Sequence, residues 1–322
     1  MASFGDLNRV NTNVQSLDAQ LSLNKINKAQ SENQLRMSTG LRINRAEDDA
    51  AGFSIATKLN SRVAGLEQAL SNVGDAKSVL DIAESSFGTV MDNLVEMKGL
   101  ATQAANDTLG AEERQYIGDQ IEKLASDIND VADQTVFQDT QLLNGTVSTG
   151  GTVSNSGGLS LTFQVGERSS DTLSTTINAV NVGELFADTG DAAFGATAGD
   201  GGTGTGSITA TAATGGNAGE LTFASTANSA DYRSFIDAVD TAIEGMNDRV
   251  NDIGMAQSSL STREVTLSQS ISANSSAASR IMDADFAKEQ SESVRLQILQ
   301  QTSTSALAQA NMGPQSVLGF LG

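Results

Sequence analysis

The sequence contains no cysteine and no histidine among its 322 residues. Disulfides, thiol nucleophiles, histidine-ligated metals and histidine general bases are therefore excluded together. Tryptophan is absent as well, and aromatic residues make up only 4% of the chain. Because the remaining apolar residues are mostly alanine, leucine, valine and isoleucine, the composition suits long helices with narrow apolar seams better than a thick globular core.

Proline and basic residues are also scarce. Pro314 is the only proline, and a chain that avoids proline can form very long helices because no backbone donor is lost from their interiors. Nineteen basic residues stand against 39 acidic ones, which gives a formal net charge of −20. Nucleic acid and anionic membranes are therefore not expected as partners, since both require a basic footprint.

Signals for targeting or catalysis are missing too. No basic segment followed by an apolar one opens the sequence, and no stretch reaches the roughly 18 apolar residues of a membrane span. Paired carboxylates such as Asp48-Asp49 and Glu112-Glu113 come without a visible cleft or set of metal ligands. No phosphate-binding loop, nucleophile elbow or zinc motif is present, so we expect no enzyme, no cofactor and no metal.

Three zones follow one another along the chain. Residues 1–144 and 230–322 have helical periodicity, whereas residues 145–229 are rich in Gly, Thr, Ser and Ala. Since helical zones flank the middle one, the two ends are expected to meet in space. A small enzyme embedded in the middle zone is the alternative from another class of function. Arg168 is the only basic residue there, which disfavours that alternative.

The first arm carries apolar residues at the heptad spacings of 3, 4, 3 and 4: Leu7, Val10, Val14, Leu17 and Leu21. This pattern predicts a coiled-coil seam. The seam becomes polar at Asn24, Lys28 and Ser31, which indicates an arm that needs a partner to stay folded. The alternative is an ordinary amphipathic helix docked on its own domain.

A much longer helix is predicted to follow. Asn44 and Glu47 have the spacing of a capping box, and the helix from about residue 46 to 105 would be roughly 90 Å long. Its apolar stripe, with steps of 3 or 4 residues, includes Leu59, Leu66, Leu80 and Phe87. A break at residues 106–108 precedes a second helix, whose stripe runs through Ile117, Ile121, Leu124 and Ile128.

The middle zone predicts strands, and the last zone predicts helices. Residues 159–165 alternate between apolar and polar, and a turn at 168–171 leads into a return strand at 172–180, which predicts a β-hairpin. Residues 207–211 and 220–224 are candidate strands beside a Gly/Thr/Ala-rich stretch. The last arm carries Val294, Ile298, Leu299, Leu307 and Ala310, and Gly313-Pro314 predicts the end of its helix.

Several runs resemble bacterial flagellin, and they occur at both ends of the chain in that family's order. They are 11–13 and 16–20 near the start, 38–44 with 46–52, 103–106, and then 279–286, 298–301 and 308–318. The resemblance covers about residues 1–185 and 228–322. It implies a mainly α fold with a small β region, in which a long antiparallel helical rod has terminal coiled-coil arms, a β-hairpin and a small variable β or loop excursion.

The domains implied by this resemblance are five. Residues 1–44 form the N-terminal arm, 45–186 the N-terminal part of the rod, 187–228 a variable surface region, 229–280 the C-terminal rod helix, and 281–322 the C-terminal arm. The Ser and Thr residues of 146–230 could carry O-glycans, against the alternative of an unmodified loop.

The implied function is that of a structural subunit that polymerises with its own copies into the extracellular flagellar filament for swimming. The implied partners are the flagellar type III export apparatus, a flagellin chaperone, the filament cap and the hook-junction proteins, and export would involve no cleaved signal peptide. The alternative is a hook–filament junction protein, which shares the terminal arms. The run at residues 311–321 favours the filament subunit.

Two surface segments are candidate contact sites. The charged group Arg42, Arg45, Asp48 and Asp49 would set packing between rods of neighbouring copies, or it is simply a solvated helix start. Residues 95–103, with Lys98, Leu100 and Gln103, align with the segment that innate receptors read in some flagellins. The receptor-activating version has arginine at Glu96 and glutamate at Gly99, so strong activation is not expected.

Overall fold

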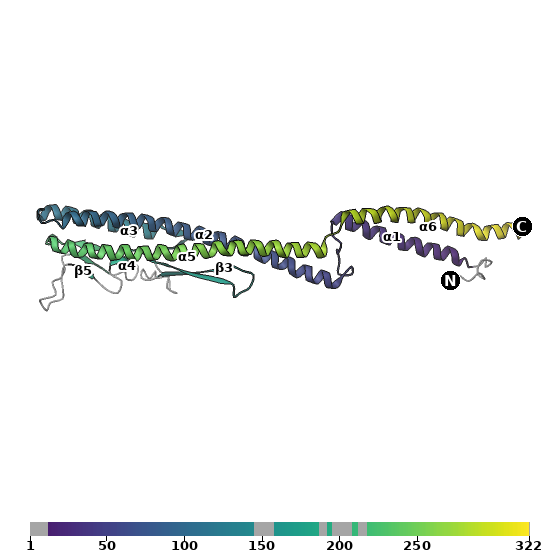
Figure 1. Cartoon of the computed structure of the whole chain (residues 1–322), viewed down its shortest axis with the longest axis horizontal. Helices are drawn as coiled ribbons and strands as arrows, with labels where there is room; N and C mark the ends of the chain where they lie inside the picture. The colour runs from purple at the N-terminus through teal and green to yellow at the C-terminus, as the bar shows by residue number, and fades with distance from the viewer. Residues whose placement is uncertain (1–11, 145–157, 187–191, 195–207, 212–217, 322) are drawn as a thin grey trace. The chain divides into compact units, whose positions relative to one another are not determined.

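The computed structural model describes residues 12–144, 158–186, 192–194, 208–211 and 218–321, and these residues are mainly helical (Figure 1). The helices are α1 (Val14–Thr39), α2 (Ala50–Ala104), α3 (Ala111–Gln134), α4 (Val182–Phe186), α5 (Ser229–Met282) and α6 (Phe286–Leu321). The strands are β1 (Val136–Phe137), β2 (Thr140–Gln141), β3 (Gly158–Gln164), β4 (Thr172–Asn178), β5 (Ala192–Phe194), β6 (Ile208–Ala210) and β7 (Leu221–Phe223). The mainly α fold with a small β region is therefore confirmed.

The chain divides into two compact units. Unit 1 consists of residues 1–64 and 270–322, and unit 2 consists of residues 65–269. The borders lie within α2 and α5, so both helices contribute to both units. None of the helices in the described ranges is long and apolar enough to cross a membrane.

Helix α2 confirms the predicted long helix, since its 55 residues span about 80 Å. Leu66, Leu80 and Phe87 of its predicted stripe are buried. The predicted capping box at Asn44 is wrong, however, because the helix begins later, where Asp49 Oδ1 accepts the backbone N–H groups of residues 51 and 52 at 3.1 and 2.9 Å. The segment before it is held by another carboxylate, that of Asp48.

The core of unit 2 lies between α2, α3, α5 and the short strands. Gly118 of α3 allows the closest approach, because a Cβ atom there would lie 2.9 Å from both Phe223 Cβ and Tyr232 Oη. The Phe223 ring lies 5.6 Å from that of Tyr232 and 5.3 Å from that of Phe235. Burial raises the pKa of Tyr232 to about 12, and its hydroxyl donates a 2.9 Å hydrogen bond to the Arg114 carbonyl.

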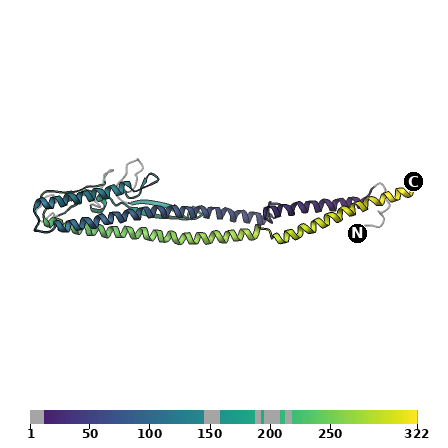
Figure 2. The same ribbon diagram turned by 90° about the horizontal axis from the view of Figure 1, so that it is seen from above.

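Within unit 2, α2 and α5 lie side by side and are joined by polar side chains (Figure 2). Lys77 Nζ lies 3.0 Å from Glu264 Oε2, and Lys98 pairs with Asp240. Helix α5 begins with a true capping box. The Asn228 side chain accepts the N–H groups of residues 230 and 231, and Asp231 Oδ2 accepts the Asn228 N–H at 2.9 Å.

The β-hairpin of β3 and β4 is confirmed, with antiparallel pairs such as Leu159↔Ile177. The second predicted pair is confirmed as β6 and β7, and β5 adds an unpredicted third strand in the order β5-β6-β7. Ile208, Leu221 and Phe223 are buried. Part of the predicted surface region 187–228 is therefore core, whereas residues 195–207 and 212–217 lie outside the described residues.

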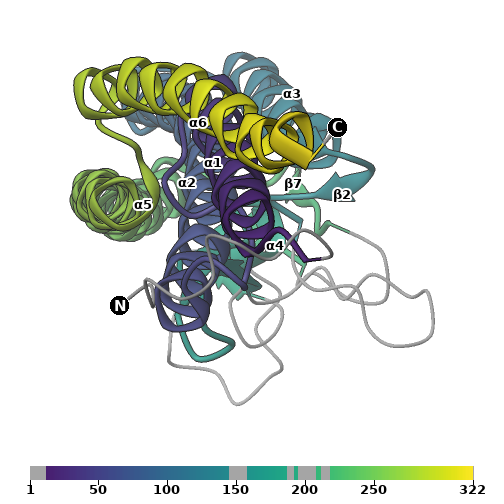
Figure 3. The same ribbon diagram turned by 90° about the vertical axis from the view of Figure 1, so that its right-hand side faces the viewer.

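In unit 1, α1 and α6 lie side by side and antiparallel (Figure 3). Polar contacts pair residues of α1 with residues of α6 in reverse order: Asn27 with Gln300, and Ser16 with Asn311. Helix α6 continues to Leu321, so the predicted helix stop at Gly313-Pro314 is wrong. The turn before the proline is stabilised from the other helix, where Asn13 Nδ2 donates a 2.8 Å hydrogen bond to the Ala310 carbonyl.

Candidate assembly interface

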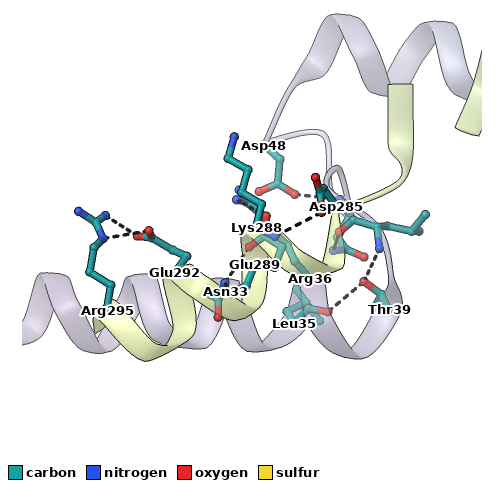
Figure 4. A network of polar contacts seen from close by, with 12 residues as sticks. Asn33, Leu35, Arg36, Thr39, Asp48, Asp285, Lys288, Glu289, Glu292 and Arg295 are labelled. Carbon is teal, nitrogen blue, oxygen red and sulfur yellow. Dashed lines mark hydrogen bonds and ion pairs between the residues drawn. The ribbon is translucent and has the colours of Figure 1, made fainter. Parts of the chain in front are cut away.

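The two arm helices are anchored where the chain enters and leaves them (Figure 4). Gly40 ends α1 with a φ of 73°, a left-handed conformation that glycine adopts without strain. The Gly40 carbonyl then accepts the Ala284 N–H at 2.9 Å, and the Arg42 N–H donates to the Met282 carbonyl at 2.5 Å. Asp285 caps α6 by accepting the N–H groups of residues 287 and 288. The start of α6 is therefore tied to the end of α1.

One face of each arm helix is turned towards the other arm. The side chains on these faces are half-buried or buried, recur at heptad spacing, and are called the seam here. On α1 they are Ser16, Ala19, Leu23, Ile26, Gln30, Asn33 and Met37. On α6 they are Glu289, Ser293, Leu296, Gln300, Ser303, Leu307 and Ala310. The seam therefore mixes a few large apolar side chains with many small or polar ones.

The predicted seam of the first arm lies on the opposite face. Val14, Leu17 and Leu21 are 36, 57 and 54% exposed. They precede seam residues by two positions, which is about 200° around a helix. These three residues therefore do not face the other arm of the same chain, and their role in assembly stays a prediction, whereas Leu7 and Val10 lie outside the described residues.

The predicted residues of the last arm lie partly in the seam and partly on the opposite face. Leu307 and Ala310 are half-buried in the seam, whereas Leu299 is 38% exposed at its side. Val294 and Ile298 are 48 and 61% exposed and point away from α1. Met312, 64% exposed, belongs with them, as do the three apolar residues of α1. The side of each arm helix that is turned away from the other arm, with these residues on it, is called the outer face here.

The charged group before α2 makes local contacts. Arg42 donates to the Ile281 carbonyl at 2.8 Å, and Arg45 pairs with Glu47 at 3.1 Å. Backbone N–H donors from Arg45 and Asn44 hold the pKa of Asp48 below its ordinary value. Asp48 also borders a groove of about 230 Å³ beside Arg36. Asp49 caps α2, so each of the four predicted residues has a local contact, and their role between copies stays a prediction.

The candidate receptor segment lies on α2 in unit 2. Lys98 is half-exposed and forms its ion pair with Asp240, Leu100 is half-buried, and Gln103 is exposed. Glu96 is exposed as well, so the charge that differs from the receptor-activating version is on the surface. Receptor recognition stays a prediction.

Charge is divided unequally between the two units. Unit 1 has eleven basic and ten acidic residues, a formal charge of +1, whereas unit 2 has eight basic and 29 acidic residues, a formal charge of −21. The arms are therefore nearly neutral, and surfaces of that kind can pack against copies of themselves without strong repulsion. Within the part of the chain that the structure describes, no cluster of three or more metal-ligating side chains occurs.

Two interior asparagines were not predicted from the sequence as contact residues. Asn33 is only 4% exposed in the seam, and Asn13 joins the start of α1 to α6. Asn33 is a polar residue at a heptad position, but the predicted seam followed the apolar residues and was placed on the other face. For Asn13 the sequence does offer a signal, because asparagine is a preferred residue at the start of a helix. In the structure, Asn13 Oδ1 accepts the Ser16 N–H at 3.0 Å.

Comparison with known proteins matches both ends of the chain. A family model described as bacterial flagellin N-terminal helical region matches residues 10–148, and one described as bacterial flagellin C-terminal helical region matches residues 236–321.

Relatives match over nearly the full length. A flagellin of Bacillus subtilis is 34% identical over 97% of this chain and 99% of its own length. A flagellar filament 33 kDa core protein of Treponema phagedenis is 29% identical over 97% and 99%. A crystal structure of Bacillus cereus flagellin matches 61% of this chain and 88% of its own, at 22% identity and a TM-score of 0.42. On the sequence matches, this chain belongs to the bacterial flagellin family.

Proposed function

We propose that this flagellin polymerises into the flagellar filament through the outer face of its arms. As a flagellin it is a structural subunit of that filament, and the matching family models and relatives favour this function over that of a hook–filament junction protein. The observation that supports the outer face is the exposure of Leu17, Leu21 and Ile298, each more than half exposed in the lone chain.

The physical reason is that each arm helix carries apolar side chains on two faces, and among the described residues only the seam face is covered by the other arm. Pairing of α1 with α6 covers the seam and leaves the outer face in water. Burying apolar surface between copies is the main favourable term in most protein association. The near-neutral charge of unit 1 removes the repulsion that would oppose such contacts, whereas unit 2 keeps the strongly acidic surface.

Thiol labelling tests this proposal, because the chain has no cysteine of its own. Leu17→Cys should react with a maleimide at least about tenfold more slowly in pelleted polymer than in the soluble chain, since burial restricts access of the reagent. Thr222→Cys, on the exposed side of β7, is the control and should react equally in both states. Equal labelling of Leu17→Cys in both states would contradict the proposal.

We also propose that the chain reaches the cell exterior through the flagellar type III export apparatus, with a chaperone before export and the filament cap and hook-junction proteins at assembly. Family membership supports this route. Intact mass of the chain from purified filaments checks it. A mass lower by a segment of 15 or more residues would indicate cleavage and contradict it.

A further inference from the structure

The seam between α1 and α6 has few large apolar side chains to set its alignment. Among the described seam residues, Leu296 is the one apolar side chain that is buried, and Leu23 and Ile26 are half-buried. Seam positions recur every seven residues, so sliding α6 by one heptad along α1 would place similar side chains opposite each other. Apolar burial therefore discriminates poorly between the observed register and a slipped one.

A buried side-chain amide near the start of α6 does discriminate between the observed register and a slipped one. Asn33 Nδ2 donates to the Glu289 carbonyl at 3.0 Å and to Glu289 Oε2 at 2.7 Å (Figure 4). Asn33 is only 4% exposed, so a slipped register would leave its amide in the seam without these acceptors. A buried polar group that loses its partner is costly, and a single asparagine inside a coiled coil can specify register for this reason.

A second asparagine acts at the other end of the seam. Pro314 has no backbone N–H, so the Ala310 carbonyl lacks the donor that residue i+4 supplies in an ordinary helix. Asn13 Nδ2 takes that place with its 2.8 Å bond to Ala310, while its Oδ1 caps α1. The proline that was predicted to end the helix thus creates an acceptor that only one register satisfies.

The spacing between the two asparagines on α1 matches the spacing between their acceptors on α6. Asn13 and Asn33 are separated by about 30 Å along α1, and Glu289 and Ala310 by about 32 Å along α6, at 1.5 Å per residue. We propose that Asn13 and Asn33 are positioning residues that fix the register of the two arms. Its consequence for the filament, a fixed axial offset between Leu17 of α1 and Ile298 of α6, rests on the proposed function.

Paired cysteines report the register directly. Asn27→Cys with Gln300→Cys marks the observed register, in which the two side chains meet at 2.9 Å. Asn27→Cys with Leu307→Cys marks a register slipped by one heptad, because these two positions are far apart along the helices in the observed register. Each pair is treated with a short bismaleimide in pelleted polymer, and the intramolecular product is measured. The ratio of the first product to the second should be at least about 10 in the otherwise unchanged chain.

Asn33→Leu tests the contact between Asn33 and Glu289 without removing the seam. The ratio should fall about tenfold, while the helix content of the arms stays the same or rises, because leucine adds apolar surface. Gln30→Leu, a similar change at a half-buried seam position, is the matched control and should leave the ratio unchanged. An unchanged ratio in Asn33→Leu, or an equal fall in Gln30→Leu, would overturn the proposal.

Asn13 is tested together with the proline. Asn13→Ser keeps a capping side chain but cannot span to Ala310, and Pro314→Ala restores the missing donor. Each change alone should lower the ratio several-fold, and the double variant should lower it no further, because both remove the same constraint. Additive effects, or no effect of either change, would overturn the role of Asn13.

The readout separates this proposal from the proposed function. Register is read from the ratio of two intramolecular products, whereas the outer-face contacts are read from labelling rates between soluble and pelleted chains. A variant that stays soluble is measured in the soluble fraction, where an unchanged ratio counts against the register proposal in the same way.

Discussion

Leu17→Gln is the sharpest test of the outer face. Glutamine has nearly the length and helix propensity of leucine, so α1 should keep its structure while it loses apolar surface on one side. Leu17 does not lie in the seam, so pairing with α6 should be unaffected. The change therefore acts on contacts between copies and leaves those within the chain.

The expected magnitude follows from the exposure of Leu17. Complete burial of a leucine side chain contributes about 1.5–3 kcal/mol. Since Leu17 is 57% exposed in the lone chain, roughly that fraction is still available to an assembly contact, about 1–2 kcal/mol per subunit. At about 1.4 kcal/mol for each factor of ten, the critical concentration for polymerisation should rise about 5- to 25-fold.

Seeded polymerisation followed by ultracentrifugation measures this quantity, because the protein left in the supernatant is at the critical concentration. Leu17→Met, which keeps an apolar side chain of similar size, is the matched control and should stay within about threefold of the unaltered chain. If Leu17→Gln polymerises at the unaltered critical concentration, the outer face of α1 is not a contact surface, and the reasoning from exposure fails.

Four further outcomes are expected. Phe223→Ala should lower the free energy of unfolding of unit 2 by about 3–5 kcal/mol in urea titrations, whereas Thr222→Ala on the exposed side of β7 should change it by less than about 0.5 kcal/mol; equal losses would mean that β7 is not core. Seeded growth should speed up as salt rises from about 10 to 150 mM, because the Debye length falls from about 30 to 8 Å and screens the repulsion between acidic copies of unit 2; slower growth would refute this. The pKa of Asp48 is lowered from its ordinary value of 3.8, so protection of the Asn44 and Arg45 amides in hydrogen exchange should persist above about pH 4 and be lost as pH falls through the lower folded pKa; in Asp48→Asn the protection should be weaker and independent of pH there. Glu96→Arg should raise signalling through an innate receptor if charge explains the expected weak response, and unchanged low signalling removes that explanation.

The long helices could be predicted because their pattern is local. The apolar stripe of α2 repeats every 3 or 4 residues over many turns, and Leu66, Leu80 and Phe87 of that stripe are buried as the pattern required. The β3–β4 hairpin was equally visible from its alternation and its turn. The β1–β2 turn was not, because Gln138 and Asp139 adopt positive φ values of 46 and 65° without the glycine that usually marks such a turn.

Helix boundaries were harder, because capping groups compete. Asn44 and Glu47 have the spacing of a capping box, but Asp49 caps α2 in their place. Asn228 and Asp231 form the box that the structure does contain. Several side chains near a helix start can cap it, and which one does so depends on where the preceding chain is held.

The sequence by itself determined that this chain is a helical, acidic flagellin without cysteine or histidine. Composition can be read directly from the sequence, and helix formation depends on apolar spacing between residues that are close together in the chain. Only the tertiary structure decided which apolar face of each arm is used within the chain. Val14, Leu17 and Leu21 are the more apolar stripe of α1, yet Leu23 and Ile26 face α6, with Asn33 buried beside Glu289. The reason is that a helix with two apolar faces contains no local information on which partner covers each face. That choice depends on contacts between residues nearly 300 positions apart, such as Asn13 and Ala310.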